Sequence, residues 1–264
     1  MKNVYTILLI IFIPICFVCD ILFGSVHIPF DAFIDVLSGN EDNELWYNII
    51  TRLRLPRAVA AILVGTALPV SGLLMQTLFR NPLADPYILG ISTGASLGVA
   101  VFSLAGGFSL GLFPTLWGSL GTAGAALIGA ALIMTVILVM APHIHDTVTL
   151  LIIGIMFGSI TSAIVNVLQY FAHPDEVHSF LLWTMGSLAN ISNNELAIMA
   201  CFVFPTVIGS LLINKQLDAI LLGENYAFSL GVNTKMLRIA IIVLSAILAG
   251  IVTAFAGPIG FVGM

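Results

Sequence analysis

Residues 86–145 read PYILGISTGASLGVAVFSLAGGFSLGLFPTLWGSLGTAGAALIGAALIMTVILVMAPHIH, sixty residues without a single Asp, Glu, Lys or Arg. A helix of about 20 mainly apolar residues crosses the hydrocarbon core of a bilayer. This stretch therefore has room for two crossings. The Gly-rich residues 105–111, followed by Pro114, are the natural break between them. The run predicts a pair of transmembrane helices.

The whole chain has a membrane-protein composition. Of its 264 residues, 59% are hydrophobic and 8% are charged, and the mean hydropathy is +1.13. Soluble domains carry about 25% charged residues, so the chain lacks the polar surface of a water-soluble globule. Its net charge of -5 has the wrong sign for binding nucleic acid. These values exclude a cytosolic enzyme, a nucleic-acid-binding protein and a disordered tail, and they predict an integral protein of the lipid bilayer.

Five further apolar stretches raise the expected number of transmembrane helices to about seven. A signal peptide is the alternative for the first stretch, but the run is long and no cleavage site follows it. Residues 177–188 are too short and too polar to span, and predict a half helix. The fold class is therefore all-α, a polytopic membrane helix bundle in one domain over residues 1–264. The five stretches are residues 4–26, 58–79, 147–171, 196–213 and 239–255.

The basic residues predict the orientation of these helices, because Lys and Arg concentrate in short cytoplasmic loops. Lys2 places the N-terminus in the cytoplasm, and Arg80 then falls in the second cytoplasmic stretch. Three more basic residues, Lys215, Lys235 and Arg238, fall in the fourth. Acidic residues, among them Asp31, Asp35, Asp175 and Glu176, fall on the outer side.

One basic cluster breaks this pattern, at the outer end of the second helix. Arg54-Leu-Pro-Arg57 places two guanidinium groups there, beside Arg52. Two interpretations remain open. The arginines could extend to the lipid headgroups, with their aliphatic stems along apolar surface. Alternatively, Arg54 and Arg57 could form an ion-pair socket for an acidic partner outside the membrane, since arginine makes forked contacts with carboxylates.

The stretch between the sixth and seventh helices has the pattern of a docking element. Residues 215–235 read KQLDAILLGENYAFSLGVNTK. Leu217, Ile220 and Leu221 fall on one helical face, Gly223 permits a sharp turn, and a second short helix ends at Gly231. Two short amphipathic helices on the cytoplasmic face fit a protein partner. An interfacial loop lying on lipid is the alternative.

The residues also indicate what the chain does not do. Apart from Asp20, the expected spans hold no Asp, Glu, Lys or Arg, whereas proton-coupled carriers place such residues at mid-membrane. No phosphate-binding loop is present, because no lysine follows a glycine. The histidines have neither the spacing of a zinc protease nor a serine partner in a helix. The sequence predicts a transport subunit without catalytic residues, whose energy comes from another polypeptide.

Several motifs, in order along nearly the whole chain, resemble the FecCD-type permeases, the membrane subunits of type II ABC importers for iron siderophores, haem and cobalamin. The matching segments are RLPR at 54–57, SGLLMQ at 71–76, RNPLADP at 80–86, LGISTGA at 89–95, WTMGSL at 183–188, LGE at 222–224 and GPIGFVG at 257–263.

The resemblance implies a ten-helix permease fold in the bacterial inner membrane. It implies a dimer with a second permease subunit, identical or related, two cytoplasmic ATP-binding subunits and an extracytoplasmic substrate-binding protein. No cofactor or metal is expected on this chain, since ATP and magnesium bind the partner ATPase. The implied cargo is a metal chelate, chiefly a ferric siderophore, with haem or cobalamin as alternatives. A secondary transporter or channel without an ATPase, and a non-transporting scaffold, are the other hypotheses.

The resemblance also assigns roles to residues. Arg54 and Arg57 match the arginines that pair with acidic residues of the binding protein. Asn81, Leu83 and Thr147 match positions that close the path towards the cytoplasm. The ATPase-coupling loop comprises Leu217, Leu221, Gly223, Glu224, Ala227, Leu230 and Gly231.

One departure concerns the C-terminus. Members of the family continue through about three more helices after the Gly-Phe-Val-Gly motif, whereas this sequence stops at Met264. We therefore expect the sequence to be incomplete at its C-terminus. The expected mechanism is alternating access, in which closure of the ATPases moves the coupling loop and rearranges the helices.

Overall fold

The computed structural model describes residues 2–24, 26, 28–38, 44–104, 118–144, 147–189 and 191–263, and every regular element within these ranges is helical. The Gly-rich break expected at residues 105–111, with Pro114, lies outside them. Contacts divide the chain into two compact units. Unit 1 comprises Met1–Ile62 and Leu188–Leu196, and unit 2 comprises Leu63–Ser187 and Ala197–Met264.

Unit 1 holds the first helices. Phe33 of the amphipathic α2 is buried against Ile21 and Ile50 in a small apolar core. The outward side chains of α1 are apolar as well, as expected of a helix that contacts lipid. The elements are α1 (Lys2–Leu22), α2 (Phe30–Leu37), α3 (Glu44–Asn48), the π-helix η1 (Ile49–Arg54) and the first turns of α4 (Leu55–Phe79).

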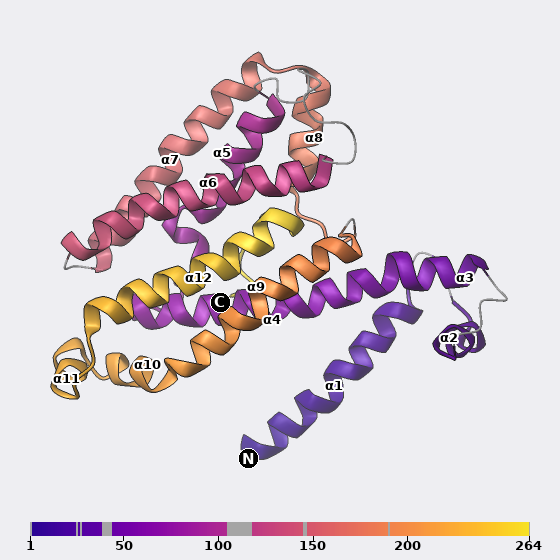
Figure 1. Ribbon diagram of the computed structural model, residues 1–264, viewed down its shortest axis with the longest axis horizontal. Coiled ribbons are helices and arrows are strands. Elements are labelled where there is room, and N and C mark those ends of the chain that lie inside the picture. Colours follow the sequence, from indigo (N-terminus) through magenta and orange to yellow (C-terminus); the bar gives the residue numbers. More distant parts are fainter. Residues whose placement is uncertain are drawn as a thin grey trace. The chain divides into compact units, whose positions relative to one another are not determined.

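Unit 2 contains the rest of α4 and most of the other helices (Figure 1). They are η2 (Pro86–Leu89), α5 (Ile91–Leu104), α6 (Gly118–Met140), η4 (Ala141–His143), α7 (Thr147–Phe171), α8 (Pro174–Thr184), α9 (Asn193–Leu212, which starts in unit 1), α10 (Asn214–Leu221), α11 (Glu224–Ser229) and α12 (Thr234–Ala256).

The helices confirm the expected membrane bundle. Among the described residues, five helices are long and apolar enough to cross a membrane: Glu44–Phe79, Leu120–Met140, Val148–Phe171, Asn193–Leu212 and Thr234–Ala256. Two shorter apolar helices, Ile10–Leu22 and Ile91–Leu104, complete the seven expected from the sequence. The short helix expected at residues 177–188 is α8, an 11-residue helix.

Glycines let α5 and α6 approach to backbone contact. A Cβ atom on Gly98 would lie 2.0 Å from the carbonyl oxygen of Ala125, and one on Gly129 would lie 2.1 Å from that of Gly94. Between membrane helices, small residues at such positions allow close van der Waals packing, which replaces the hydrophobic driving force of water. Gly94 and Gly98, four residues apart, therefore mark the face of α5 that packs on α6.

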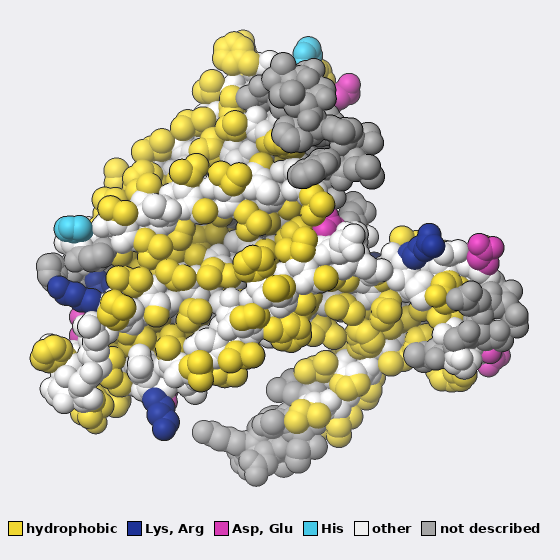
Figure 2. Space-filling view, in the orientation of Figure 1, with side chains coloured by type: hydrophobic (Ala, Val, Ile, Leu, Met, Phe, Trp, Pro, Cys, Tyr) yellow, Lys and Arg dark blue, Asp and Glu magenta, His cyan; other side chains and the backbone are white. Residues whose placement is uncertain are grey.

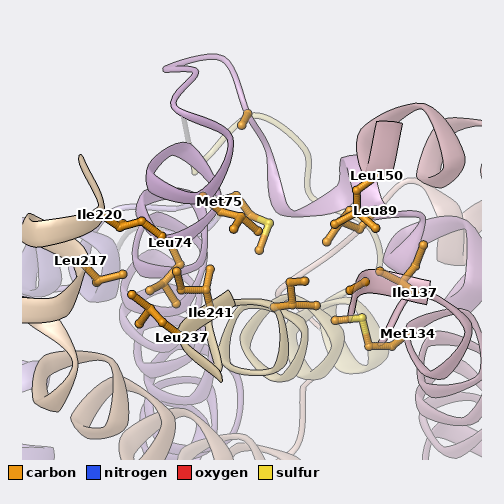
Figure 3. Close-up of a cluster of buried hydrophobic side chains, with 14 residues drawn as sticks. Leu74, Met75, Leu89, Met134, Ile137, Leu150, Leu217, Ile220, Leu237 and Ile241 are labelled. Atoms are coloured by element: carbon orange, nitrogen blue, oxygen red, sulfur yellow. The ribbon is translucent and has the colours of Figure 1, made fainter. Parts of the chain in front are cut away.

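A buried apolar cluster joins α4, α6, α10 and α12 (Figure 3). Leu217 and Ile220 of α10 lie in this cluster beside Leu74 of α4 and the side chains Leu237 and Ile241 of α12. Because α10 packs on the ends of the long helices, its position depends on theirs.

We expect Gly98→Ala to lower the stability of the α5–α6 contact by about 1–3 kcal/mol, because the added methyl group collides with backbone that cannot move alone. The matched control is Gly124→Ala in α6, where no atom lies within 4 Å of the new Cβ. Thermal unfolding of the detergent-purified variants measures the difference. Equal melting temperatures for the two variants would show that the close approach is not required.

Candidate functional site

The α10–α11 hairpin has a buried underside. Leu217, Ile220 and Ala227 are 6%, 3% and 0% exposed. Gly223 connects the two helices with φ of +132°, a conformation that side chains disfavour, so the turn requires glycine. The two short helices and the turn predicted from the sequence are therefore present.

The outer face of this hairpin is apolar and exposed. We define it as Leu221, Leu222, Tyr226, Phe228 and Leu230, whose side chains are 50% to 74% exposed. Leu221 follows Leu217 by one helical turn, as the sequence predicts, but its side chain is exposed whereas that of Leu217 is buried. The buried sector of α10 is centred on Ala219 and Ile220, so Leu221 lies beyond its edge, 52% exposed. Exposed apolar patches of this kind mark interaction surfaces.

Two arginines attach the hairpin to the helical unit. The Nη2 atom of Arg80 donates to the carbonyl oxygen of Ile220 at 3.1 Å. The Nη1 atom of Arg238 donates to the carbonyl oxygen of Ile144 at 2.7 Å, and its Nη2 atom pairs with Oε1 of Glu224 at 3.1 Å. These bonds bring the loop after α4, the segment before α7 and the hairpin to one end of unit 2. The view in Figure 2 shows Lys and Arg gathered at the hairpin end of this unit, whereas hydrophobic side chains cover its helices.

The expected gate residues lie at this same end. The backbone N–H of Leu83 donates to the side-chain oxygen of Asn81 at 3.0 Å, which shapes a tight turn. Leu83 is 69% exposed at the tip of this turn. Thr147 is the first residue of α7, although its side chain lies outside the described part of the chain.

A buried carboxylate, Asp85, connects the start of η2 to the segment after α12, a role that the sequence did not predict. Its Oδ1 atom accepts from the N–H of Tyr87 at 2.8 Å, and its Oδ2 atom accepts from the N–H of Phe261 at 3.3 Å. Gln76 adds a bond from its Nε2 atom to the carbonyl oxygen of Gly263 at 3.2 Å. An Asp followed by a proline is a helix-start signal, so the bond to Tyr87 could have been predicted. The bond to Phe261 joins residues far apart in the sequence and had no local signal.

The two predicted docking arginines, in unit 1, have different surroundings. Arg54 is half-buried, and its guanidinium donates to the carbonyl oxygen of Ile21 at 2.5 Å and to that of Val26. Arg57, three residues later, is exposed and forms no ion pair with any residue that the structure describes. Arg54 thus fastens the end of α1 to the start of α4, whereas Arg57 is available to a partner.

The α7 helix carries a polar stripe. Leu150, Gly154, Thr161 and Val165 are buried, and the glycine lies against η2. A different sector exposes Ser159, Ser162 and Asn166, and it continues to the half-buried Gln169. Their spacing of three and four residues places them on one side of the helix. In a membrane-spanning helix, an exposed polar sector faces a water-filled path or another chain rather than lipid.

The fold and these surfaces define the class of the protein as a polytopic membrane permease. Comparison with known proteins agrees: a model described as the FecCD transport family matches residues 8–264. The chain belongs to the FecCD transport family.

Individual relatives and a solved structure support this assignment. The hemin transport system permease protein HmuU of Yersinia pestis is 38% identical over 242 residues, or 91% of this chain and 70% of that protein. The vitamin B12 import system permease protein BtuC of Vibrio cholerae is 33% identical over 256 residues, or 96% of this chain and 72% of that protein. A solved structure described as an inward-facing conformation of a metal-chelate type ABC transporter matches with a TM-score of 0.79 and 26% identity. That match covers 99% of this chain and 78% of the other.

We expect Arg54→Gln to destabilise unit 1 by about 1–3 kcal/mol, because it removes the donors of the Ile21 and Val26 carbonyl groups. Arg57→Gln, the matched control on an exposed position, should change stability by less than about 0.5 kcal/mol. Thermal unfolding in detergent distinguishes the two. If both variants melt with the wild type, the Arg54 contacts do not hold α1 in place.

Proposed function

We propose that the protein is the permease subunit of an ATP-dependent importer that carries a metal chelate across the bacterial inner membrane. The observation that carries this proposal is the exposed apolar outer face of the α10–α11 hairpin, fixed to the helical unit by buried side chains and two arginines. A surface of this kind can bind a protein partner and transmit the movement of that partner to the long helices. The coupling-loop residues Leu217, Leu221, Gly223, Glu224, Ala227, Leu230 and Gly231 all belong to this hairpin or its exit.

The charges favour a cytoplasmic position for the hairpin. Arg80, Lys235 and Arg238 accompany it at one end of unit 2, and basic residues mark the cytoplasmic side of membrane proteins. On this orientation the N-terminus is cytoplasmic, and the partners at the hairpin are two ATP-binding subunits that hold ATP and magnesium. The permease itself contributes no catalytic residue. The acidic Glu224 and Asp218 argue against the alternative, a loop lying on anionic lipid.

The polar stripe of α7 supports a transport path. Ser162 and Asn166 present a hydroxyl and an amide where an uncharged, polar wall is needed. We propose that this stripe faces a second permease subunit across the path, and that Asn81, Leu83 and Thr147 close the path at the hairpin end. A path without charged side chains would hold its cargo weakly, so selectivity would come from an outer binding protein.

The opposite end of α4 suits that binding protein. Arg57 is exposed beside Arg54, and an arginine makes forked hydrogen bonds with a carboxylate. We propose that Arg57 contacts an acidic side chain of an extracytoplasmic substrate-binding protein. The bonds of Arg54 to α1 would hold the first turn of α4 in position for this contact. Direct pairing of Arg54 with the binding protein stays a prediction.

The proposed cargo is a ferric siderophore, and haem is the alternative that the relatives favour. The permease HmuU, at 38% identity, is named for hemin, and BtuC, at 33%, for vitamin B12. All three cargoes are large metal chelates.

We expect the double substitution Leu222→Asp/Phe228→Asp to abolish binding of the cognate ATP-binding subunit, because two charges would be buried in an apolar contact. Asn225→Asp, on the same hairpin and exposed, is the control and should co-purify normally. Both side chains of the double variant are exposed, so the permease itself should fold. A double variant that retains the ATPase would contradict this docking surface.

The reconstituted complex then tests transport. Proteoliposomes that contain the permease, its ATPase and binding protein should accumulate a labelled ferric siderophore only when ATP is supplied on the side of the membrane that carries the ATPase. The same vesicles offered hemin or cobalamin identify the cargo. Uptake that continues with the Leu222→Asp/Phe228→Asp variant and without ATP would instead establish a secondary transporter or channel.

We also expect Asn166→Leu to reduce ATP-driven uptake at least about fivefold while the complex still assembles, because it removes the amide from the proposed wall of the path. Val167→Leu, one residue later in the exposed apolar sector, is the control and should transport like the wild type. Uptake rates measured at equal protein content compare the two variants with the wild type. Equal rates for the two variants would place the polar stripe outside the path.

A further inference from the structure

Arg238 occupies a junction between three segments that the sequence keeps far apart. It belongs to the second turn of α12, and its side chain is 13% exposed. One guanidinium nitrogen reaches Glu224, the first residue of α11. The other reaches the carbonyl oxygen of Ile144, which lies between η4 and α7. The guanidinium therefore links the hairpin directly to the segment that leads into α7.

This double contact requires an arginine. The planar guanidinium presents five N–H donors in a fixed fork, so it can bond two partners in different directions at once. A lysine at the same place would carry its three N–H donors on one nitrogen at the end of a flexible stem, so it would not reproduce the spacing of the two guanidinium contacts. The geometry thus uses a property that charge alone does not supply.

Contacts other than those of Arg238 also hold the hairpin in place. Leu217, Ile220 and Ala227 bury its underside, and Arg80 bonds the end of α10. Beside Arg238, moreover, a cavity of about 120 Å³ is lined by Ile144, Glu224 and Lys235, among others. The guanidinium therefore borders open space on one side.

We propose that Arg238 is a positioning residue that transmits movement of the α10–α11 hairpin to α7. When the hairpin is displaced, Glu224 pulls the guanidinium, which carries the Ile144 carbonyl group and the start of α7 with it. The polar stripe of α7 is proposed to line the path. The contacts of Arg238 would therefore connect the ATPase-binding face of the hairpin to the wall of that path. This inference rests on the proposed function.

The test compares ATP hydrolysis with transport in the reconstituted importer. Arg238→Gln should assemble with the ATPase and hydrolyse ATP, but cargo transported per ATP should fall at least about fivefold, the scale of a typical coupling energy. Arg238→Lys keeps the charge and should lose most of the coupling too. Lys235→Gln, which removes a neighbouring exposed charge on the same helix, is the matched control and should couple like the wild type.

A distance measurement tests the bridge without transport. In a background with Cys16, Cys19 and Cys201 replaced by serine, spin labels at Asn225→Cys and Ile152→Cys report the separation of the hairpin and α7. In nanodiscs the wild-type distribution should be narrow, and Arg238→Gln should broaden it. Lys235→Gln should leave it unchanged.

The outcomes separate this inference from the proposed function. A wild-type complex that shows no ATP-driven uptake would contradict the proposed function. The spin-label distances would still test the Arg238 contacts in the permease alone. Wild-type coupling and a narrow distribution in Arg238→Gln overturn the inference and leave the importer intact. If Arg238→Gln does not assemble, Arg238→Lys decides, and normal coupling in that variant also overturns the inference.

Discussion

The bilayer imposes the constraint on which the structure depends: no water reaches its core, so each spanning segment must satisfy its own backbone hydrogen bonds. Only helices do this with one segment, and helices between lipid tails gain little from apolar burial. They must instead pack closely, and here Gly98 and Gly129 let α5 and α6 meet at backbone distance. The scarcity of charged residues within the apolar spans follows from the same constraint, because an unpaired charge there is costly.

Charged residues consequently gather at the helix ends, and there they bond to other segments of the chain. Arg80 and Arg238 each donate to a backbone carbonyl group that lies in another segment. Arg54 does the same for the end of α1 in unit 1. Each guanidinium thus joins a helix end to a segment distant in the sequence. Under the proposed function, such connections would carry movement of the hairpin towards the transport path.

Much of the fold could be predicted, because the signals are local. Seven apolar helices among the described residues, the short α8 and the Gly223 turn all follow from composition and spacing within short stretches of the sequence. The burial of individual α10 side chains was harder to predict. Leu221 lies at the edge of the buried sector, and the position of that sector depends on α4 and α12. Of the two contacts of Asp85, only the bond to Tyr87 had a local sequence signal, because Phe261 belongs to a segment far along the chain.

The sequence by itself determined that this protein is a helical membrane permease of a recognisable family, because hydropathy and motif order are properties of the chain alone. It also determined which residues are basic and near which helix ends they fall. Only the tertiary structure decided their roles. Arg54 bonds α1 while Arg57 stays exposed, and Arg238 connects Glu224 to Ile144. Hydrogen bonds of this kind depend on positions within a few tenths of an ångström between segments up to 94 residues apart, and no local pattern encodes them.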